Sequence, residues 1–187
     1  MRVAYKGFTL GKKGLPEARL GSGITEYEVG KWYDNPEAKT ASTGFHCCEN
    51  PLECLSYYSY TKGNVFYAVD VGGDVDEDAN HRISCTRIRL LKELDTHSFL
   101  LAAVRYIVSH PKIACNKVYL NKASTSARDT FVFVRGKNPV GAGKKGDHVV
   151  LLQEAADDVS IKAVQLIYID GKKYAPMVYY NIDREAV

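Results

Sequence analysis

The sequence predicts an α+β fold with antiparallel sheets, two short helices and a β-rich C-terminal part. Three observations support this class. The chain of 187 residues is rich in aromatic side chains, with 13 Tyr and 6 Phe, and aromatic residues favour strands. Short alternating runs separated by Gly, Pro and Asn recur along its length. Only two segments space their apolar residues as a helix does.

The N-terminal half contains most of the expected strands. We predict strands at residues 3–8, 24–29, 65–71 and 83–90, with a short apolar run at 44–48. Trp32-Tyr33 lies between two turns, and Gly72-Gly73 is expected to end the strand before it.

The first helix is predicted to begin at Asn50-Pro51. Asn is a good N-cap, and Pro at the first helical position loses only a donor that has no partner. Leu52, Leu55 and Tyr58 then recur at three-residue steps and form one apolar stripe. Gly63-Asn64 should end this helix.

The second helix is predicted over residues 96–110. Asp95 can cap its N-terminus, and Pro111 stops it. A subdomain boundary is expected just beyond, which divides the chain into an α+β domain at 1–112 and a β-rich subdomain at 113–187.

The C-terminal subdomain is predicted to consist of short strands. They are expected at residues 118–120, 131–134, 149–152, 163–169 and 178–180. Asp170-Gly171 indicates a hairpin, because Asp-Gly supplies the positive φ angles of a tight turn.

Charge and cysteine content restrict the function and the compartment. The net charge of +3, from 25 basic and 22 acidic residues, is too balanced for the basic face of a nucleic-acid-binding protein. No apolar run reaches the ~18 residues of a membrane span, and residues 1–7 do not read as a signal peptide. Five cysteines, an odd number, fit reduced thiols in a cytoplasm.

The cluster His46-Cys47-Cys48-Glu49, with Cys54 nearby, contains residue types that occur in zinc sites and in nucleophilic catalysis. Adjacent cysteines on a strand point to opposite faces, so they do not easily share a zinc ion. His46 and Cys48 at this spacing do not form a known nucleophile and base pair. We expect buried, reduced thiols, and no catalytic residue, metal or cofactor.

Four carboxylates, Asp74, Asp76, Glu77 and Asp78, form what we call the acidic segment. Its spacing begins like a calcium loop, but Ala79 and Cys85 stand where that loop needs Gly and Glu. We expect a loop between two strands, either a plain solvated turn or a surface that binds a basic partner.

The stretch 136–145 is rich in Gly and Lys but lacks the phosphate-loop order of Gly, Lys and Ser or Thr. We predict a mobile basic connection, in which Lys144 and Lys145 can contact a partner. The sequence leaves open whether Tyr57, Tyr58, Tyr60 and Tyr67 belong to a core or to an interface.

Residues 5–8, 27–33 and 44–58 carry a family resemblance. The stretch Gly-Phe-His-Cys-Cys-Glu-Asn-Pro-Leu at 44–52 resembles the signature of an uncharacterised domain family of phages and prophages, common in gut Firmicutes. The resemblance continues to residue 94, and residues 136–180 are similar to the β-rich ending of many relatives. It implies a mobile-element accessory protein, a class that includes inhibitors of host defence.

A weaker likeness is to ADP-ribosyltransferase-type folds, through Tyr5-Lys6-Gly7 and Gly44-Phe45. Lys6 stands where that fold has an Arg or His that grips NAD, and no Ser or Thr follows Phe45. Glu154 is the one candidate for its catalytic Glu.

The expected function is that of a phage-derived protein, in the cytoplasm of a bacterial host, that binds and inhibits a defence protein such as a CRISPR nuclease without catalysis. The expected partner is therefore a host protein, with the acidic segment, Lys144 and Lys145 as binding residues. The balanced charge argues against direct binding to nucleic acid, but the sequence leaves that alternative open. The alternative is an NAD-dependent ADP-ribosyltransferase that modifies a host protein.

Overall fold

The computed structural model describes residues 2–21, 23–78, 82–115 and 117–187. The chain divides into two compact units, Met1–Ala103 and Val104–Val187. About half of it, 50%, is strand and 11% is helix. The mixed α+β class is therefore broadly confirmed, with less helix than the sequence predicts.

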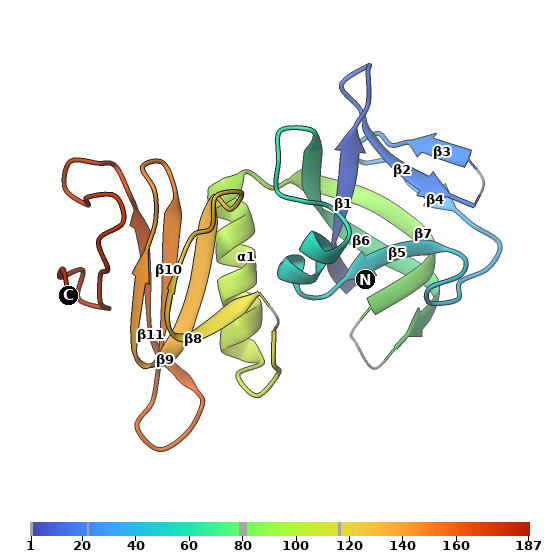
Figure 1. The fold of residues 1–187 in the computed structure, drawn as a ribbon. Helices are drawn as coiled ribbons and strands as arrows, with labels where there is room; N and C mark the ends of the chain where they lie inside the picture. The colour runs from blue at the N-terminus through green and yellow to red at the C-terminus, as the bar shows by residue number, and fades with distance from the viewer. Residues whose placement is uncertain (1, 22, 79–81, 116) are drawn as a thin grey trace. The chain divides into compact units, whose positions relative to one another are not determined.

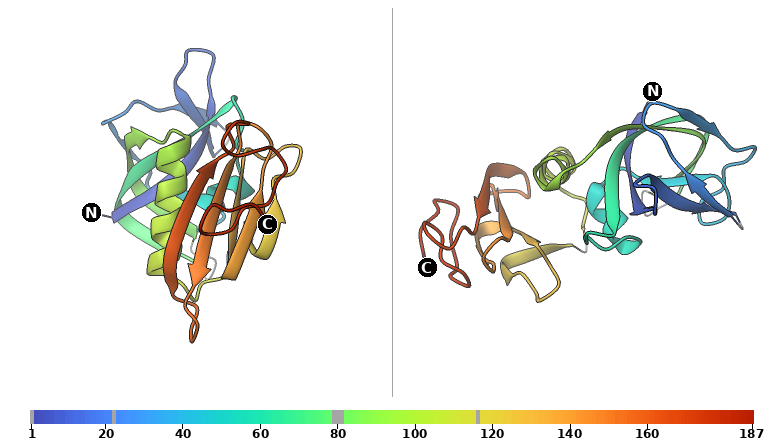
Figure 2. Two further views of the ribbon diagram at one scale, coloured as in Figure 1. Left: turned by 90° about the vertical axis from the view of Figure 1, so that its left-hand side faces the viewer. Right: turned by 90° about the horizontal axis from the view of Figure 1, so that it is seen from above.

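The first unit is an antiparallel sheet that closes on itself. Its strands are β1 (Arg2–Leu10), β2 (Pro16–Leu20), β3 (Gly23–Glu26), β4 (Trp32–Asp34), β5 (Phe45–Cys48), β6 (Asn64–Glu77) and β7 (Arg82–Glu93). β1 pairs with β5, β5 with β7, β7 with β6, and β6 with β1, so four strands form a small barrel (Figures 1 and 2). The strands β2 and β3 extend from β1, and β4 adds to β7.

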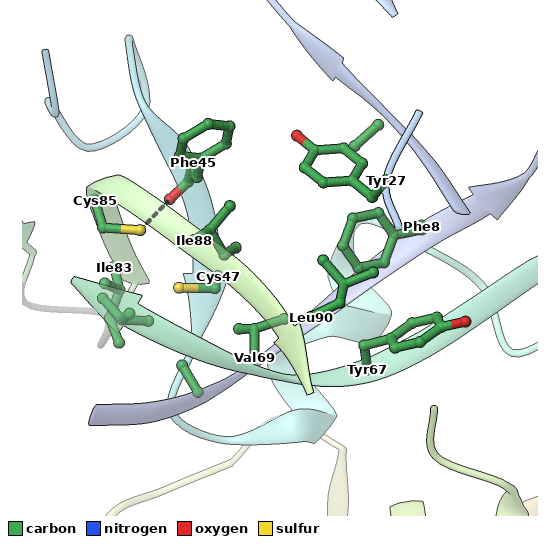
Figure 3. Close-up of a cluster of buried hydrophobic side chains, with 13 residues drawn as sticks. Phe8, Tyr27, Phe45, Cys47, Tyr67, Val69, Ile83, Cys85, Ile88 and Leu90 are labelled. Carbon is green, nitrogen blue, oxygen red and sulfur yellow. Dashed lines mark hydrogen bonds between the residues drawn. The ribbon is translucent and has the colours of Figure 1, made fainter. Parts of the chain in front are cut away.

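The barrel interior is filled by alternate residues of its strands, as the two-residue period of a strand requires. Phe8 lies among aromatic rings, with its centroid 5.1 Å from that of Tyr27 and 5.7 Å from that of Tyr67 (Figure 3). The aliphatic and sulfur-bearing members include Val69, Val71, Ile83, Ile88, Leu90, Cys47 and Cys85. This cluster excludes water from the barrel and holds the outer faces of its strands in place.

The first predicted helix is a single 3-10 segment, η1 (Pro51–Ser56). Asn50 caps it as predicted, since its side chain accepts a hydrogen bond from the Leu52 N–H. The length was wrong, because residues beyond Ser56 are not helical. The apolar steps of three residues match the 3.0-residue turn of a 3-10 helix, which is rarely long.

The second helix, α1 (Thr96–Ser109), is confirmed with its predicted signals. Asp95 Oδ1 accepts from the Ser98 N–H at 2.7 Å, and the helix ends before Pro111. The ring centroid of Phe99 lies 5.0 Å from that of Phe66 and 5.2 Å from that of Tyr60. The boundary between the two units falls inside α1.

The tyrosines at positions 57, 58, 60 and 67 differ in burial. Tyr67 lies in the barrel core, and Tyr57 is exposed. Tyr60 is half-buried and stacks on Phe66, with ring centroids 5.3 Å apart. Only Tyr57 therefore offers most of its ring to solvent.

The second unit carries a four-stranded sheet in the order β11-β10-β9-β8. Its strands are β8 (Val118–Ser124), β9 (Phe131–Ala142), β10 (His148–Glu154) and β11 (Ile161–Tyr168). The expected antiparallel sheet is only partly correct, because β9 is parallel to both β8 and β10. The hairpin predicted at Asp170-Gly171 is wrong, since residues 178–180 form no strand. Tyr180 makes isolated bridges with Gly141 and Ala186 instead.

Parallel neighbours so close in sequence require β9 to bend. Twelve extended residues span roughly 40 Å, and the five residues between Ala142 and His148 cannot return over that distance. The register between β8 and β9 slips where Asn121 faces residues 136–139. Asn121 has a φ of 63° and Gly136 a φ of 152°, so both strands turn at the same corner.

This bend encloses the second core. It contains alternate residues of the strands, Val132, Val134, Val149, Leu151 and Ile167, together with Ile169 and Tyr180. The mobile connection predicted at 136–145 is therefore wrong, because residues 136–142 belong to β9.

Candidate functional site

Three of the four residues of the acidic segment, Asp74, Asp76 and Glu77, lie on a strand and not in a loop, and Asp78 directly follows that strand. β6 continues past Gly72-Gly73 to Glu77 and pairs there with β7, with Val75 opposite Cys85 and Glu77 opposite Ile83. The prediction that Gly72-Gly73 ends the strand was wrong because Gly73, at a φ of 70°, allows a β-bulge in place of a break.

The bulge is tied to the neighbouring strand. The Asp74 N–H donates to Thr86 Oγ1 at 2.9 Å, and a Cβ added at Gly73 would lie 2.0 Å from the same oxygen. A larger residue does not fit at position 73. The bulge therefore determines the direction of the part of β6 that carries Asp74, Asp76 and Glu77.

Most of these carboxylates have partners in the chain. Asp76 Oδ2 accepts from both the N–H and the hydroxyl of Thr40 at 2.6 Å. These bonds hold the pKa of Asp76 below its ordinary value. Glu77 pairs with Arg2, and Asp78 pairs with Arg82. Of the four carboxylates, only that of Asp74 has no polar partner among the described residues.

These contacts order the acidic segment without covering it. Asp74, Asp76 and Glu77 are exposed, and Asp78 is half-buried. Ala79, which the calcium comparison used, lies outside the described residues. The segment can present ordered negative charge to a cationic group.

Trp32 on β4 lies against two arginines of β7. Its ring is 4.8 Å from the Arg87 Cζ and 4.7 Å from the Arg89 Cζ, within cation–π range. Asp34, opposite Arg87 in register, accepts from Arg87 Nε at 2.7 Å. Sequence reasoning missed this group, although the alternation of Arg87 and Arg89 beside the sole Trp was a usable signal.

A buried carboxylate holds Arg89 in this arrangement. Asp70 on β6 is only 2% exposed, and its Oδ2 accepts from Arg89 Nη2 at 2.7 Å. The other Asp70 oxygen and the Arg89 Nε are buried without a hydrogen bond in the described structure. We call these five residues, Trp32, Asp34, Asp70, Arg87 and Arg89, the tryptophan face.

The tryptophan face and the acidic segment are continuous along β6. Gly72 is opposite Arg87, and Asp74 follows two residues later. The Thr86 that binds the Asp74 N–H directly precedes Arg87. An aromatic ring, two guanidinium groups and exposed carboxylates therefore lie on neighbouring strands.

The two predicted lysines have different surroundings. Lys144 Nζ donates to the carbonyls of Ser126, Ala127 and Asp129 at 2.6, 3.2 and 3.0 Å. Those bonds tie the β8–β9 connection to the chain after β9. Lys145 is exposed.

The cysteines are buried, as predicted, except for Cys115, which is half-buried. Cys47 and Cys85 hydrogen-bond inside the barrel, and this bond with burial raises the pKa of Cys47. A matching bond with Cys48, and burial, raise the pKa of Cys54. Since the thiolate is the nucleophile, Cys47 and Cys54 are poorly suited to covalent catalysis.

The described residues offer no centre for a metal. They contain no group of three or more His, Cys, Asp or Glu side chains that could hold an ion. His46 has a buried Nε2 without a hydrogen bond in this part of the chain, and burial lowers its pKa.

Glu154, the candidate acid of the ADP-ribosyltransferase likeness, lies on β10 and forms an ion pair. Its Oε1 accepts from Arg135 Nε at 2.7 Å. Arg135 is 9% exposed and also donates through Nη2 to the carbonyls of Pro111 and Val159, both at 3.0 Å.

Residues 2–102 match a family described as a domain of unknown function, DUF7666. This region covers more than half of the chain. The chain belongs to the DUF7666 family. The resemblance to an uncharacterised domain family is confirmed to that extent. No curated protein and no solved structure matches the chain.

The DUF7666 region contains the whole barrel, the tryptophan face and the acidic segment, and it ends within α1. Lys144, Lys145 and the Arg135–Glu154 pair lie beyond it. No helix of the described residues is long and apolar enough to cross a membrane. Of the candidate functional features, the family match therefore covers the tryptophan face and the acidic segment.

Proposed function

We propose that this DUF7666 protein is a phage-derived binding protein that inhibits a bacterial host-defence protein, such as a CRISPR nuclease, without catalysing a reaction. The tryptophan face and the acidic segment form its binding surface. The proposed phage origin and the location in the host cytoplasm rest on the sequence resemblance.

The observation that carries this proposal is the continuity of these two features on β4, β6 and β7. Trp and Arg are the residues that most often dominate the binding energy of protein interfaces. Here Trp32 is held by Arg87 and Arg89, and Asp70 holds Arg89. A side chain fixed before binding loses less conformational entropy when the partner arrives.

The neighbouring carboxylates favour a basic partner. Asp74, Asp76 and Glu77 lie exposed on a paired strand. Nucleic-acid-binding proteins carry concentrated positive charge for phosphates. Complementary charge of this kind mainly increases the association rate and the discrimination between partners.

The test is inhibition of a defence nuclease in cells and in purified form. We would express the chain in strains that each restrict a phage through one CRISPR nuclease, and measure plaque formation. We expect plaques to be restored in at least one strain, and the purified chain to block cleavage by that nuclease. Failure across the panel of nucleases would overturn the proposal.

Two variants and a matched control locate the surface. Trp32→Ala, and the triple variant D74N/D76N/E77Q, should each weaken inhibition. The double variant D157N/D183N removes exposed carboxylates from the second unit and should inhibit normally. Equal inhibition by all of these proteins would contradict the assignment of the surface.

No specific observation favours the alternative, an ADP-ribosyltransferase activity. Lys6, which stands at the position of the NAD-gripping residue, is buried and donates to the His46 carbonyl at 2.7 Å. Incubation with labelled NAD and host lysate should transfer no label to protein. Label transfer that is lost in Glu154→Gln would replace the binding proposal by the enzymatic one.

A further inference from the structure

A cavity of about 560 Å³ lies within the second unit, outside the DUF7666 region. This volume is in the range of small-molecule sites. Its walls are mostly apolar and include Ile107, Pro111, Ile113, Val118, Leu120 and Val159. The ion pair of Arg135 and Glu154 supplies two of its few polar residues.

The hydrogen bonds of Arg135 leave one nitrogen unused. Nε donates to Glu154, and Nη2 donates to the two carbonyls of Pro111 and Val159. Nη1 donates to no residue in the part of the chain that the structure describes. Nη1 is therefore the nitrogen of this cavity-lining residue that remains as a donor for a ligand.

The buried charge at the cavity is already balanced. Glu154 neutralises Arg135 at 2.7 Å. Lys112, also on the cavity wall, is exposed, so its ammonium group remains in water. A charged ligand group would therefore be desolvated among apolar walls without a free counter-charge, which is costly.

We propose that this cavity binds a small uncharged molecule with an apolar body and a carbonyl group that accepts a hydrogen bond from Arg135 Nη1. The apolar walls take the body of the ligand. The balanced ion pair provides a donor without attracting an anion. The site is independent of the proposed surface on the barrel.

Three probes of nearly the same shape test the charge requirement. Benzamide is neutral, benzoate is an anion and benzamidine is a cation at neutral pH. We would titrate each into ¹⁵N-labelled full chain and follow the amide signals of residues 111–120. Benzamide should bind more tightly than either ion, by about tenfold or more, because an unpaired charge is costly to bury.

Glu154→Gln should reverse this preference. The Gln side-chain oxygen can still accept from Arg135 Nε, so the local hydrogen bond is retained. The positive charge of Arg135 is then no longer balanced, and benzoate should become the tightest of the three probes. Thermal unfolding of the variant serves as the control that it folds.

A second variant tests the location. Ala114 is an exposed residue of the cavity wall, so Ala114→Trp should fill the opening without entering the core and abolish benzamide binding. Tighter binding of benzoate or benzamidine to the wild-type chain would overturn the proposal. Unchanged selectivity in Glu154→Gln, or no binding of benzamide, would overturn it as well.

Discussion

The Lys6 side chain points into the barrel and donates from Nζ to the backbone carbonyl of His46 at 2.7 Å. Ala4 and Phe8, two residues before and after it on β1, belong to the interior cluster. The amine also lies 5.3 Å from the centroid of the Phe8 ring. A lysine therefore occupies a place in the barrel where an apolar residue is usual.

We predict that Lys6→Met leaves stability within about 1 kcal/mol of wild type at pH 7. Met retains the bulk of the stem and removes the cost of burying an amine, but it loses the bond to His46. Lys6→Ala should lose about 2–4 kcal/mol, because it creates a cavity. Urea unfolding measures both. Equal losses in the two variants would contradict this account.

The same pair of proteins should differ in pH dependence. Burial holds the folded-state pKa of Lys6 below its ordinary value of 10.5. Between the folded pKa and 10.5, the unfolded chain binds more protons, so stability rises with pH in that window. The stability of wild type relative to Lys6→Met should therefore increase up to about pH 10.5 and then level off. A flat difference would show that burial does not perturb Lys6.

Arg89→Met should destabilise the barrel by about 3 kcal/mol, since it leaves the buried Asp70 carboxylate without its ionic partner. The double variant D70N/R89M should lose less than the sum of the single variants, because the unpaired charge is gone. Denaturant unfolding of the four proteins gives this coupling directly. Additive losses would indicate that the two side chains act independently.

Gly73→Ala should lower stability by roughly 1–3 kcal/mol, because a Cβ does not fit the positive φ of the bulge beside Thr86. Gly63→Ala is the matched control, since a Cβ added there meets no other atom within 4 Å. Thermal unfolding compares the two. Equal stability of both variants would mean that the bulge is not needed.

Thiol labelling should separate one cysteine from the other four. Cys115 is half-buried, whereas Cys47, Cys48, Cys54 and Cys85 are buried. The native protein should label once at a moderate rate and then slowly, and the denatured protein should show five free thiols under non-reducing conditions. Two missing thiols after denaturation would reveal a disulfide and contradict the reduced state.

Removing the charges of the acidic segment should slow association with the target nuclease several-fold at low salt. The variant D74N/D76N/E77Q/D78N tests this by stopped-flow or surface binding across a salt series. The difference should shrink as salt screens the charges. An association rate that is unchanged at every salt concentration would mean that the acidic segment is a solvated surface that does not bind the target.

Local features of the fold were predictable wherever one segment decides its own structure. The Asp95 cap, the stop before Pro111 and the Asn50 cap depend on residues within a few positions of each other. The strand β1 was predicted from the sequence, and β7 was recognised from its alternation. The buried state of most thiols followed from the hydrophobic character of free cysteine.

The tertiary structure decided which strands pair, and with that the surface of the protein. β5 closes the barrel between β1 and β7, and the bulge at Gly73 turns an expected loop into a strand. Trp32 meets Arg87 and Arg89 only because β4 pairs with β7. Lys144 is enclosed by three carbonyls from residues 126–129. Local propensity does not specify such contacts, because their energy comes from packing between segments far apart in the sequence.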